Sequence, residues 1–371
     1  TSGTTGNPKG VMLTHGNLLS NSLAALEVMP TGPDDVVLTW LPFTHIYART
    51  VDHYIRMAAG TLVVLAESAE TLVQNLDDVR PTHFASVPRF YEKVLASAAS
   101  ADPAETGRRL RRVFGPRIDW MSSGGAPLPP AVARAYHDAG LLVLQGYGLT
   151  ETAPIITFNC KDNYKLDTVG RPLPGVEVRV APDGEVLTRG HNVMKGYWND
   201  PAATAEAIRD GWLHTGDLGE LDADSFLRIT GRKKDLLVLS NGKKVASACV
   251  EGLLQADPCI DQAVVCGEGR SFLCALLAPS WDNVRRALAE EGVALDGGPD
   301  EWARRPEVRG LLERRVCAAL TDLSRMEQVR KFVVLPRPFT VESGELTVSL
   351  KLRRNVVLAR FAEEIERLYR E

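Results

Sequence analysis

Short apolar runs alternate with stretches of helical periodicity over the first part of the chain. The runs at residues 36–41, 61–65 and 141–144 have the length and residue types of strands. The segments 86–99 and 130–139 have the length and pattern of helices. Strands that alternate with helices in this way are typical of α/β layers built on parallel strands. We therefore expect a layered α/β architecture.

The pattern changes between residues 168 and 229. Short strands are expected at 176–181, 184–189 and 226–229, and the turns around them are rich in Gly, Pro and Asp. This texture predicts a small β-rich subdomain.

Beyond Gly231 helices and strands return. The elements expected there are helices at 250–255, 281–291 and 308–323 and strands at 262–267 and 272–278. We predict a large domain at 1–230, with an α/β part at 1–165 and a β-rich part at 166–230. A smaller domain follows at 231–371.

The composition excludes several classes of protein. The formal net charge is −4, with 43 basic and 47 acidic residues interspersed, so no positive field marks a nucleic-acid partner. The six cysteines form no CxxC pair, which argues against a zinc site or a disulfide framework and favours the reducing cytoplasm. No apolar run approaches the roughly 20 residues of a spanning helix. Peripheral contact with the inner membrane face and a homodimer remain open.

The first ten residues, TSGTTGNPKG, concentrate groups that bind polyphosphate. They hold four hydroxyl side chains, three glycines and one lysine. Glycines let backbone N–H groups turn toward a phosphate, hydroxyls donate further hydrogen bonds, and Lys9 supplies a positive charge. The spacing is not that of a Walker A loop. The alternative is a surface loop rich in Gly and Thr.

This loop resembles the phosphate loop of the adenylate-forming, or AMP-binding, superfamily, and the resemblance spans the full chain. It implies an α/β fold in which a large N-terminal domain, containing a small β-barrel subdomain, precedes a smaller mobile α+β domain. It also implies that the loop grips the β- and γ-phosphates of ATP. The residues concerned are Thr1, Ser2, Gly3, Thr4, Thr5, Gly6 and Lys9.

A second motif, QGYGLTET at 145–152, follows a predicted strand. Open α/β sheets bind ligands at the carboxyl ends of their strands, and this motif offers an aromatic ring, hydroxyls and a carboxylate. The alternative is a Tyr packed in a turn, with Thr150 or Thr152 capping a helix. The resemblance implies that Tyr147, between Gly146 and Gly148, stacks on adenine, that Thr150 contacts the α-phosphate and that Glu151 holds Mg²⁺.

Two further segments resemble pocket-lining parts of the family. Gly124, Gly125 and Ala126 lie in SGGAP at 123–127, which is similar to the segment that lines the adenine and acyl pockets. By itself SGGAP reads as a tight turn. His45 is either a packing residue or part of the acyl pocket.

A third motif, GWLHTGD at 211–217, ends on Asp217, whose carboxylate can accept hydrogen bonds from both ribose hydroxyls. The resemblance assigns it that role, gives Arg232 a contact with the same ribose, and makes Lys234 the hinge of the smaller domain. Without the resemblance, Asp217 reads as a turn residue and the charged run 231–235 as a solvated face.

A fourth segment, LTVSLKLRR at 346–354, places Lys351 where the family has its catalytic lysine. A mobile lysine can stabilise the negative charge that accumulates on the α-phosphoryl group during adenylation. Val348 stands where long-chain synthetases often have a proline.

Several segments resemble long-chain fatty acyl-CoA synthetases in particular. They are 41–49, 240–245, 326–332 and 339–347. Two departures are Arg49, which stands where some relatives have a gating Trp, and 246–249, which lacks expected prolines.

The resemblance therefore implies a ligase that uses a fatty acid, ATP with Mg²⁺, and CoA. The product is a CoA thioester formed through an acyl-adenylate. The alternatives are transfer to an acyl carrier protein, arrest at the acyl-AMP, or a nucleotide-binding fragment. Because the chain begins on its own phosphate loop, we expect residues 1–371 alone to fold poorly or turn over slowly.

Overall fold

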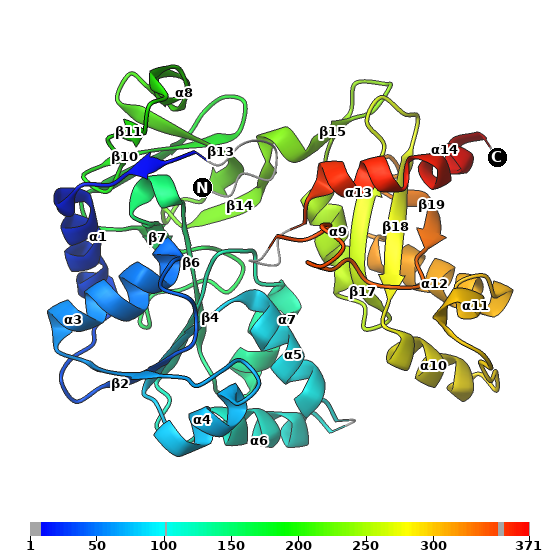
Figure 1. The fold of residues 1–371 in the computed structure, drawn as a ribbon, viewed down its shortest axis with the longest axis horizontal. Helices are drawn as coiled ribbons and strands as arrows, with labels where there is room; N and C mark the ends of the chain where they lie inside the picture. The colour runs from blue at the N-terminus through cyan, green and yellow to red at the C-terminus, as the bar shows by residue number, and fades with distance from the viewer. Residues whose placement is uncertain (1–8, 101, 348–351, 371) are drawn as a thin grey trace. The chain divides into compact units, whose positions relative to one another are not determined.

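The described residues fall into two units, which divide between Ile229 and Thr230. The computed structural model in Figure 1 describes residues 9–100, 102–347 and 352–370. The predicted α/β class is confirmed, because parallel strands alternate with helices through most of the first unit.

A seven-stranded sheet organises the first unit. Its order is β3-β2-β4-β5-β6-β7-β8, and the first five strands in this order run parallel. The last two are antiparallel to their neighbours. The strands are β2 (Val36–Thr39), β3 (Leu62–Leu65), β4 (His83–Ser86), β5 (Trp120–Ser123), β6 (Val143–Gly148), β7 (Ile155–Phe158) and β8 (Arg171–Pro172).

Both faces of this sheet are covered by helices (Figure 1). Leu38, Phe84, Met121 and Val143 are paired in register, so they share one face, and they belong to one apolar core. Trp120 belongs to the core of the opposite face. The first face packs on α4 (Leu72–Val79), α5 (Pro88–Ala98), α6 (Pro103–Phe114) and α7 (Pro130–Asp138), and the second packs on α1 (His15–Val28), a π-helix (Arg49–Tyr54) and α3 (Ile55–Ala59).

A five-stranded sheet follows where the sequence predicts the β-rich part. Its order is β12-β13-β10-β9, with β14 paired to β13. The end strands β9 and β12 do not pair in the described residues, so this sheet is open where the resemblance implies a barrel. The strands are β9 (Val176–Val180), β10 (Glu185–Gly190), β12 (Ile208–Arg209), β13 (Trp212–Leu221) and β14 (Leu227–Arg232).

Four short elements complete the first unit. Strand β1 (Val11–Met12) pairs antiparallel with β11 (Gly196–Tyr197). Helix α8 (Pro201–Ala207) follows β11, and the short helix α2 (Ile46–Ala48) precedes the π-helix. The pairing of β1 fixes the residues that follow the predicted phosphate loop.

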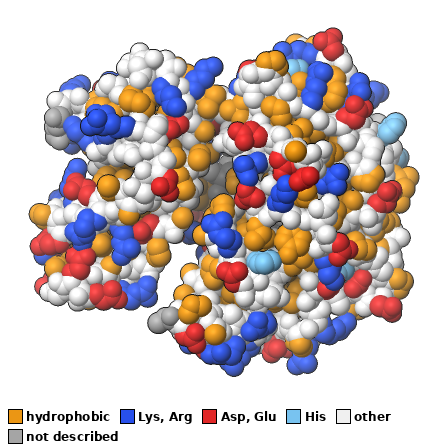
Figure 2. Space-filling model, turned by 180° about the vertical axis from the view of Figure 1, so that it is seen from behind, with side chains coloured by type: hydrophobic (Ala, Val, Ile, Leu, Met, Phe, Trp, Pro, Cys, Tyr) orange, Lys and Arg blue, Asp and Glu red, His pale blue; other side chains and the backbone are white. Residues whose placement is uncertain are grey.

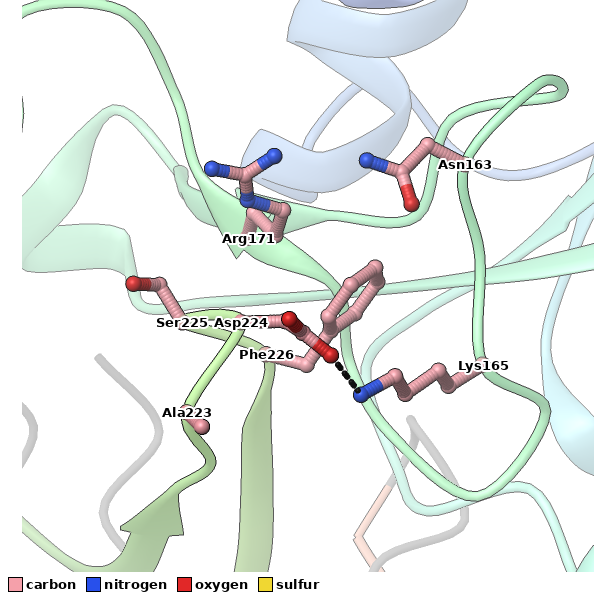
Figure 3. Close-up of a pocket in the computed structure, with 7 residues that line it drawn as sticks. All are labelled: Asn163, Lys165, Arg171, Ala223, Asp224, Ser225 and Phe226. Atoms are coloured by element: carbon pink, nitrogen blue, oxygen red, sulfur yellow. Dashed lines mark hydrogen bonds and ion pairs between the residues drawn. The ribbon is translucent and has the colours of Figure 1, made fainter.

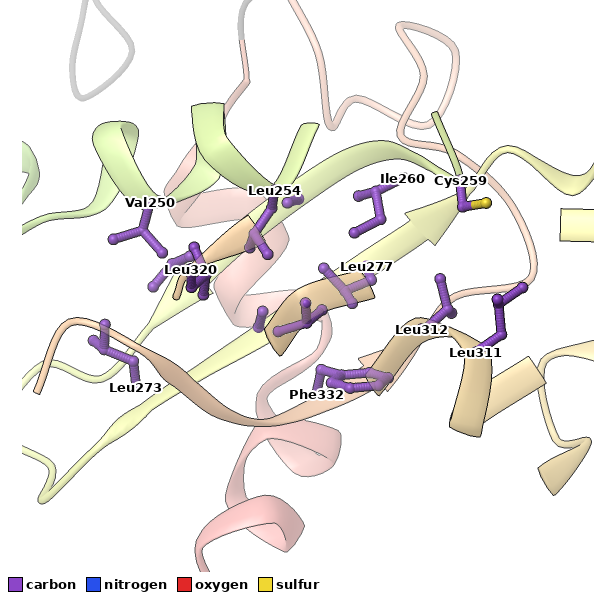
Figure 4. Close-up of a cluster of buried hydrophobic side chains, with 14 of the residues drawn as sticks. Val250, Leu254, Cys259, Ile260, Leu273, Leu277, Leu311, Leu312, Leu320 and Phe332 are labelled. Atoms are coloured by element: carbon purple, nitrogen blue, oxygen red, sulfur yellow. The ribbon is translucent and has the colours of Figure 1, made fainter. Parts of the chain in front are cut away.

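The second unit is built on a three-stranded sheet in the order β17-β18-β19. One face carries Val265, Leu277 and Phe332, and Figure 4 shows the apolar cluster that they form with side chains of α9 and α12. The elements are β15 (Leu236–Val238), β16 (Lys244–Ala246), α9 (Ser247–Gln255), β17 (Ile260–Cys266), β18 (Leu273–Pro279), α10 (Trp281–Glu290), α11 (Pro299–Trp302), α12 (Pro306–Ala319), β19 (Val329–Val334), α13 (Arg354–Arg360) and α14 (Ala362–Arg370).

The predicted start of the helix at 86–99 is wrong. Ser86 is expected to lie in a helix, but it ends strand β4, and α5 begins at Pro88. Proline suits the first turn of a helix because its missing N–H has no partner there in any case.

The surface mixes charges of both signs. Figure 2 shows Lys and Arg side chains interspersed with Asp and Glu on the visible face. Within the described part of the chain, no helix is both long and apolar enough to cross a membrane.

Candidate active site

Strand β6 carries the Gly-Tyr-Gly motif inside the sheet, which corrects the prediction that the strand ends at residue 144. Gly148 pairs with Ile155 of β7. A Cβ at Gly148 would lie 1.8 Å from the carbonyl oxygen of Pro154, and one at Gly146 would lie 2.7 Å from the Phe158 ring. Glycine therefore allows β7 to approach closely enough to extend β6, although the same glycines read as a strand end in the sequence.

Tyr147 and Asp217 meet, although 70 residues separate them. The Tyr147 hydroxyl donates a 2.7 Å hydrogen bond to Oδ2 of Asp217. Asp217 lies on β13 and is only 3% exposed. Two residues that were predicted to contact one nucleoside are thus neighbours in the first unit.

Glu185 supports the turn before Asp217, a role that no motif in the sequence indicates. Its buried carboxylate accepts a 3.0 Å hydrogen bond from the N–H of Gly216 and lies 3.1 Å from Nδ1 of His214. The N–H of Asp217 donates to Thr215 Oγ1 at 3.1 Å. Hydrogen bonds from Gly216 to Glu185 and from Asp217 to Thr215 therefore hold the backbone at Asp217.

Glu151 and Lys9 both contact Tyr197, a residue that the sequence reasoning missed. The Tyr197 hydroxyl donates a 2.8 Å hydrogen bond to Oε1 of Glu151, and Lys9 Nζ lies 4.9 Å from the centre of the same ring. Burial and the Glu151 charge raise the pKa of Tyr197. The N–H of Trp198 donates to the Gly10 carbonyl at 2.7 Å. Pairing of β1 with β11 thus brings the end of the predicted phosphate loop to the predicted metal ligand.

The two threonines that follow β6 have different surroundings. Thr150 is half-buried and begins a short 3₁₀-helix, Thr150–Thr152. Thr152 is buried, its hydroxyl accepts a 3.0 Å hydrogen bond from the N–H of Leu149, and it contacts the Pro154 carbonyl at 2.5 Å. Strand β7 follows this turn, so Thr152 does not cap a following helix as the alternative predicted; its hydroxyl is bonded within its own turn.

Gly124 lies against the ring of Tyr47. A Cβ at Gly124 would be 3.0 Å from two ring atoms of Tyr47, whose hydroxyl is 3.0 Å from Ser122 Oγ. His45 Nδ1 accepts a 3.2 Å hydrogen bond from the N–H of Tyr47, so the imidazole caps α2. This contact supports the interpretation of His45 as a packing residue. Gly125, which has a φ of 82°, and Ala126 are exposed.

The remaining predicted residues are placed as follows. Arg232 ends strand β14, and Lys234 lies in a 3₁₀-helix at Lys233–Asp235; both are exposed and belong to the second unit. Lys351 lies outside the described residues, as do Thr1, Ser2, Gly3, Thr4, Thr5 and Gly6.

A metal at this site would have one protein carboxylate. The described residues contain no cluster of three or more His, Cys, Asp or Glu side chains that could hold an ion. Mg²⁺ commonly binds through one or two carboxylates together with substrate phosphates and water. Glu151 fits that pattern, because only Oε1 is taken by Tyr197.

A polar cavity of about 430 Å³ lies elsewhere in the first unit (Figure 3). Lys165 is paired with Asp222 at 2.6 Å and with Asp224 at 2.8 Å, so its charge is compensated. None of the predicted site residues lines this cavity. The lining residues are Asn163, Lys165, Arg171, Ala223, Asp224, Ser225 and Phe226.

Ionisable side chains are buried where the π-helix and α3 meet the large sheet. Asp52 accepts a 2.8 Å hydrogen bond from Thr39, and Arg56 Nη1 lies 3.4 Å from Nδ1 of His83. Burial raises the pKa of Asp52 to about 6, although Arg56 and Thr39 act in the opposite direction. Burial and the Arg56 charge lower the pKa of His83 to about 4.

These two shifts predict opposite pH profiles. Between pH 6.5 and 4 the unfolded chain binds a proton at His83 before the folded chain does, so His83 lowers the free energy of unfolding as the pH falls. Asp52 binds its proton first in the folded chain, so its contribution rises over a similar range. Each of the two groups changes the free energy of unfolding by on the order of 2–3 kcal/mol over this range.

We expect Asp52→Asn to show a steeper loss of stability toward pH 4 than the parent chain. We expect His83→Gln to lose less stability toward pH 4 than the parent chain does. Urea unfolding at pH 4.5 and 6.5 measures both slopes. Equal slopes in the three proteins would contradict this assignment.

Two family models match the chain. The AMP-binding enzyme model matches residues 1–198, and the AMP-binding enzyme C-terminal domain matches residues 234–371. The first match covers more than half of the chain, so the chain belongs to the AMP-binding enzyme family.

Curated relatives extend this result along the whole chain. The long-chain-fatty-acid CoA ligase FadD15 of Mycobacterium bovis is 35% identical, and the match covers all of this chain and 68% of the relative. The peroxisomal long chain acyl-CoA synthetase 7 of Arabidopsis thaliana is 31% identical, with 60% of its length covered.

Solved structures share the fold. The O-succinylbenzoate CoA synthetase of Bacillus subtilis in complex with AMP has a TM-score of 0.74 and 27% identity over 96% of this chain and 67% of its own. ATP-bound MatB from Rhodopseudomonas palustris has a TM-score of 0.75 and 27% identity over 97% of this chain and 67% of its own. The chain thus has the adenylate-forming fold.

Proposed function

We propose that this protein is an ATP-dependent ligase that joins a long-chain fatty acid to CoA through an acyl-adenylate. The observation that carries the proposal is the convergence of Tyr147 with Asp217, and of Lys9 with Glu151 through Tyr197. Relatives named as long-chain-fatty-acid CoA ligases support the substrate class.

The nucleoside would bind between β6 and β13. Tyr147 offers its ring to adenine, and the exposed Gly125 and Ala126 would lie beside the base. Gly146 and Gly148 would support the ring by letting β7 pack closely against β6. Asp217 would accept hydrogen bonds from the ribose hydroxyls. A carboxylate has about four acceptor positions, of which the bond from Tyr147 uses one. Arg232 is the proposed second ribose contact.

The triphosphate would lie along residues 1–10 toward Glu151. Backbone N–H groups and hydroxyls of residues 1–6 would hold the β- and γ-phosphates with Lys9, and Thr150 would donate to the α-phosphate. Glu151 would hold Mg²⁺. When bound, the ion neutralises charge on the phosphate oxygens.

The first half-reaction is an in-line substitution at the α-phosphorus of ATP. A carboxylate oxygen of the fatty acid attacks, the bond to the β-phosphate oxygen breaks, and pyrophosphate leaves with the electron pair. Lys351 would stabilise the added negative charge on the α-phosphoryl oxygens. The acyl group would pass near Gly124 and His45.

The second half-reaction transfers the acyl group to CoA. The CoA thiolate attacks the acyl carbonyl, and AMP leaves as a phosphate anion. We propose Lys234 as the hinge about which the smaller domain reorients between the two half-reactions. A homodimer and contact with the inner membrane face stay predictions.

Pyrophosphate release over a panel of carboxylates from acetate to palmitate tests the proposal. Palmitate is expected to give the highest kcat/KM, and Lys351→Ala is expected to lower the rate by at least about 10²-fold. A clear preference for acetate or an aromatic acid would refute the long-chain assignment. Thioester assays with CoA and with acyl carrier protein identify the acceptor.

A further inference from the structure

The strand that carries Asp217 contains a bulge that ends on this residue. Strands β10 and β13 pair antiparallel, and their register shifts between Glu185 and Leu187 of β10. Only one residue of β10 lies in this interval, whereas β13 has three residues there, 215–217. A bulge bends its strand and turns side chains in new directions, and bulges are common beside active sites. The direction of the Asp217 side chain therefore depends on the shape of this bulge.

The Glu185 carboxylate holds the bulge from the neighbouring strand. The Glu185 side chain is 5% exposed, its Oε1 accepts the 3.0 Å hydrogen bond from the N–H of Gly216, and its Oε2 lies 3.1 Å from His214 Nδ1. Gly216 has a φ of 71°, a conformation that glycine adopts without strain. The carboxylate thus contacts the residue before the bulge and the middle residue of the bulge. Its removal would leave the half-buried N–H of Gly216 without this acceptor.

Thr215 contributes the other contacts of the bulge. Its hydroxyl donates a 2.7 Å hydrogen bond to the Val186 carbonyl and accepts one from the N–H of Asp217 at 3.1 Å. The Asp217 carboxylate in turn accepts the hydrogen bond from Tyr147. A change in the shape of the bulge would therefore move the Asp217 carboxylate relative to Tyr147, the proposed adenine contact.

We propose that Glu185 is a positioning residue that directs the Asp217 carboxylate toward the ribose hydroxyls of ATP, and that it thereby makes the site selective for ribonucleotides. This proposal rests on the proposed function, which assigns the ribose to Asp217. Glu185 need not touch the nucleotide, because it acts through the backbone of the bulge. Hydrogen bonds weaken steeply with distance and angle, so a displaced Asp217 would lose the ribose while the contacts proposed for adenine and the phosphates remain.

Equilibrium binding of ATP and of 2′,3′-dideoxy-ATP to the full 371-residue chain tests the proposal. The second nucleotide lacks both ribose hydroxyls, so the ratio of the two Kd values measures the contribution of these groups. Isothermal titration calorimetry with Mg²⁺ measures each Kd without turnover. The parent chain is expected to bind ATP roughly 10²-fold more tightly than the dideoxy nucleotide. Glu185→Ala is expected to weaken ATP binding about 10-fold and to leave the Kd of the dideoxy nucleotide within about twofold.

Glu220→Ala is the matched control, because it removes a carboxylate from an exposed position on the same strand as Asp217. It should leave both Kd values unchanged. If Glu185→Ala does not fold, which circular dichroism would show, Glu185→Asp replaces it. The shorter side chain keeps the charge but no longer spans the distance to both Gly216 and His214, so a smaller loss of selectivity is expected.

A double variant separates positioning from a general structural effect. Substitutions at residues that act through one another are not additive. In a chain that already carries Asp217→Ala, the further change Glu185→Ala should therefore alter the Kd for ATP by less than about twofold. A further weakening of about 10-fold would overturn the positioning role.

The outcomes separate the two proposals. If Asp217→Ala keeps the selectivity of the parent chain, Asp217 does not bind the ribose and the proposed nucleotide site fails. If Asp217→Ala abolishes the selectivity while folded Glu185→Ala keeps it within about twofold, only the positioning role fails. An equal loss of affinity for both nucleotides in Glu185→Ala would also overturn the positioning role, because a general structural defect would explain it.

Discussion

A Gly148→Ala variant is expected to lose more than about 3 kcal/mol of stability and all adenylation activity. The added Cβ would lie 1.8 Å from the Pro154 carbonyl oxygen, 2.7 Å from its carbon and 3.1 Å from Ile155 Cα. These are backbone atoms of the segment that pairs with β6, so no side-chain rotation relieves the clash. Strand β7 would have to separate from β6, which would displace Tyr147.

Urea unfolding followed by circular dichroism, together with pyrophosphate release, measures both losses. Gly32→Ala is the control in the same unit, because no heavy atom lies within 4 Å of a Cβ built there. We expect its unfolding midpoint to match that of the parent chain. A Gly148→Ala midpoint equal to that of the control would show that the strand pairing is not as tight as described.

An Asp217→Ala variant is expected to lower kcat/KM for ATP by roughly 10²-fold, mostly through KM. Hydrogen bonds to a charged group contribute about 1.5–3 kcal/mol each, and the variant would lose those proposed to the ribose. Initial rates of pyrophosphate release over a range of ATP concentrations measure the effect.

Tyr147→Phe is the control for the loss of the Tyr147–Asp217 hydrogen bond itself. It keeps the ring and the carboxylate, so we expect kcat/KM for ATP to fall by less than about fivefold. If Asp217→Ala leaves KM for ATP within about twofold, Asp217 does not bind the ribose. If Tyr147→Phe is as damaging as Asp217→Ala, the loss comes from the Tyr147–Asp217 hydrogen bond and not from contacts with the ribose.

Local patterns in the sequence predicted most of the elements but not their contacts. The apolar run at 141–144 and the helical pattern at 130–139 each depend on neighbouring residues, and both elements are present. The extension of β6 to Gly148 depends on β7, which pairs from beyond a turn. Sequence spacing contains no information on such a partner.

The candidate site was predictable only where a motif marked it. Tyr147, Glu151 and Asp217 stand in recognisable strings, and the structure brings each to a specific partner. Glu185 and Tyr197 stand in segments with no distinctive spacing, so only the fold reveals that they hold Asp217 and Glu151.

The sequence pattern also did not predict that charged residues are buried in the first unit. In a sequence, an ionisable residue such as Asp52 or Arg56 reads as surface, because an uncompensated charge is costly to bury. Both are nearly inaccessible in the structure. Asp52 and Arg56, four residues apart, partly compensate each other's charge. Their contacts with Thr39 and His83 come from other elements, and no local pattern reveals those.

In the second unit, the N–H of Val265 donates a hydrogen bond to Glu251 Oε1, and the Val265 carbonyl accepts one from Arg354 Nη1. β17 is an edge strand, and the N–H and C=O of Val265 would otherwise be available to a strand from another molecule. Edge strand β3 of the large sheet exposes Leu62 and Leu65. Intermolecular strand addition, and the aggregation that it seeds at high protein concentration, would therefore begin at β3 rather than at β17.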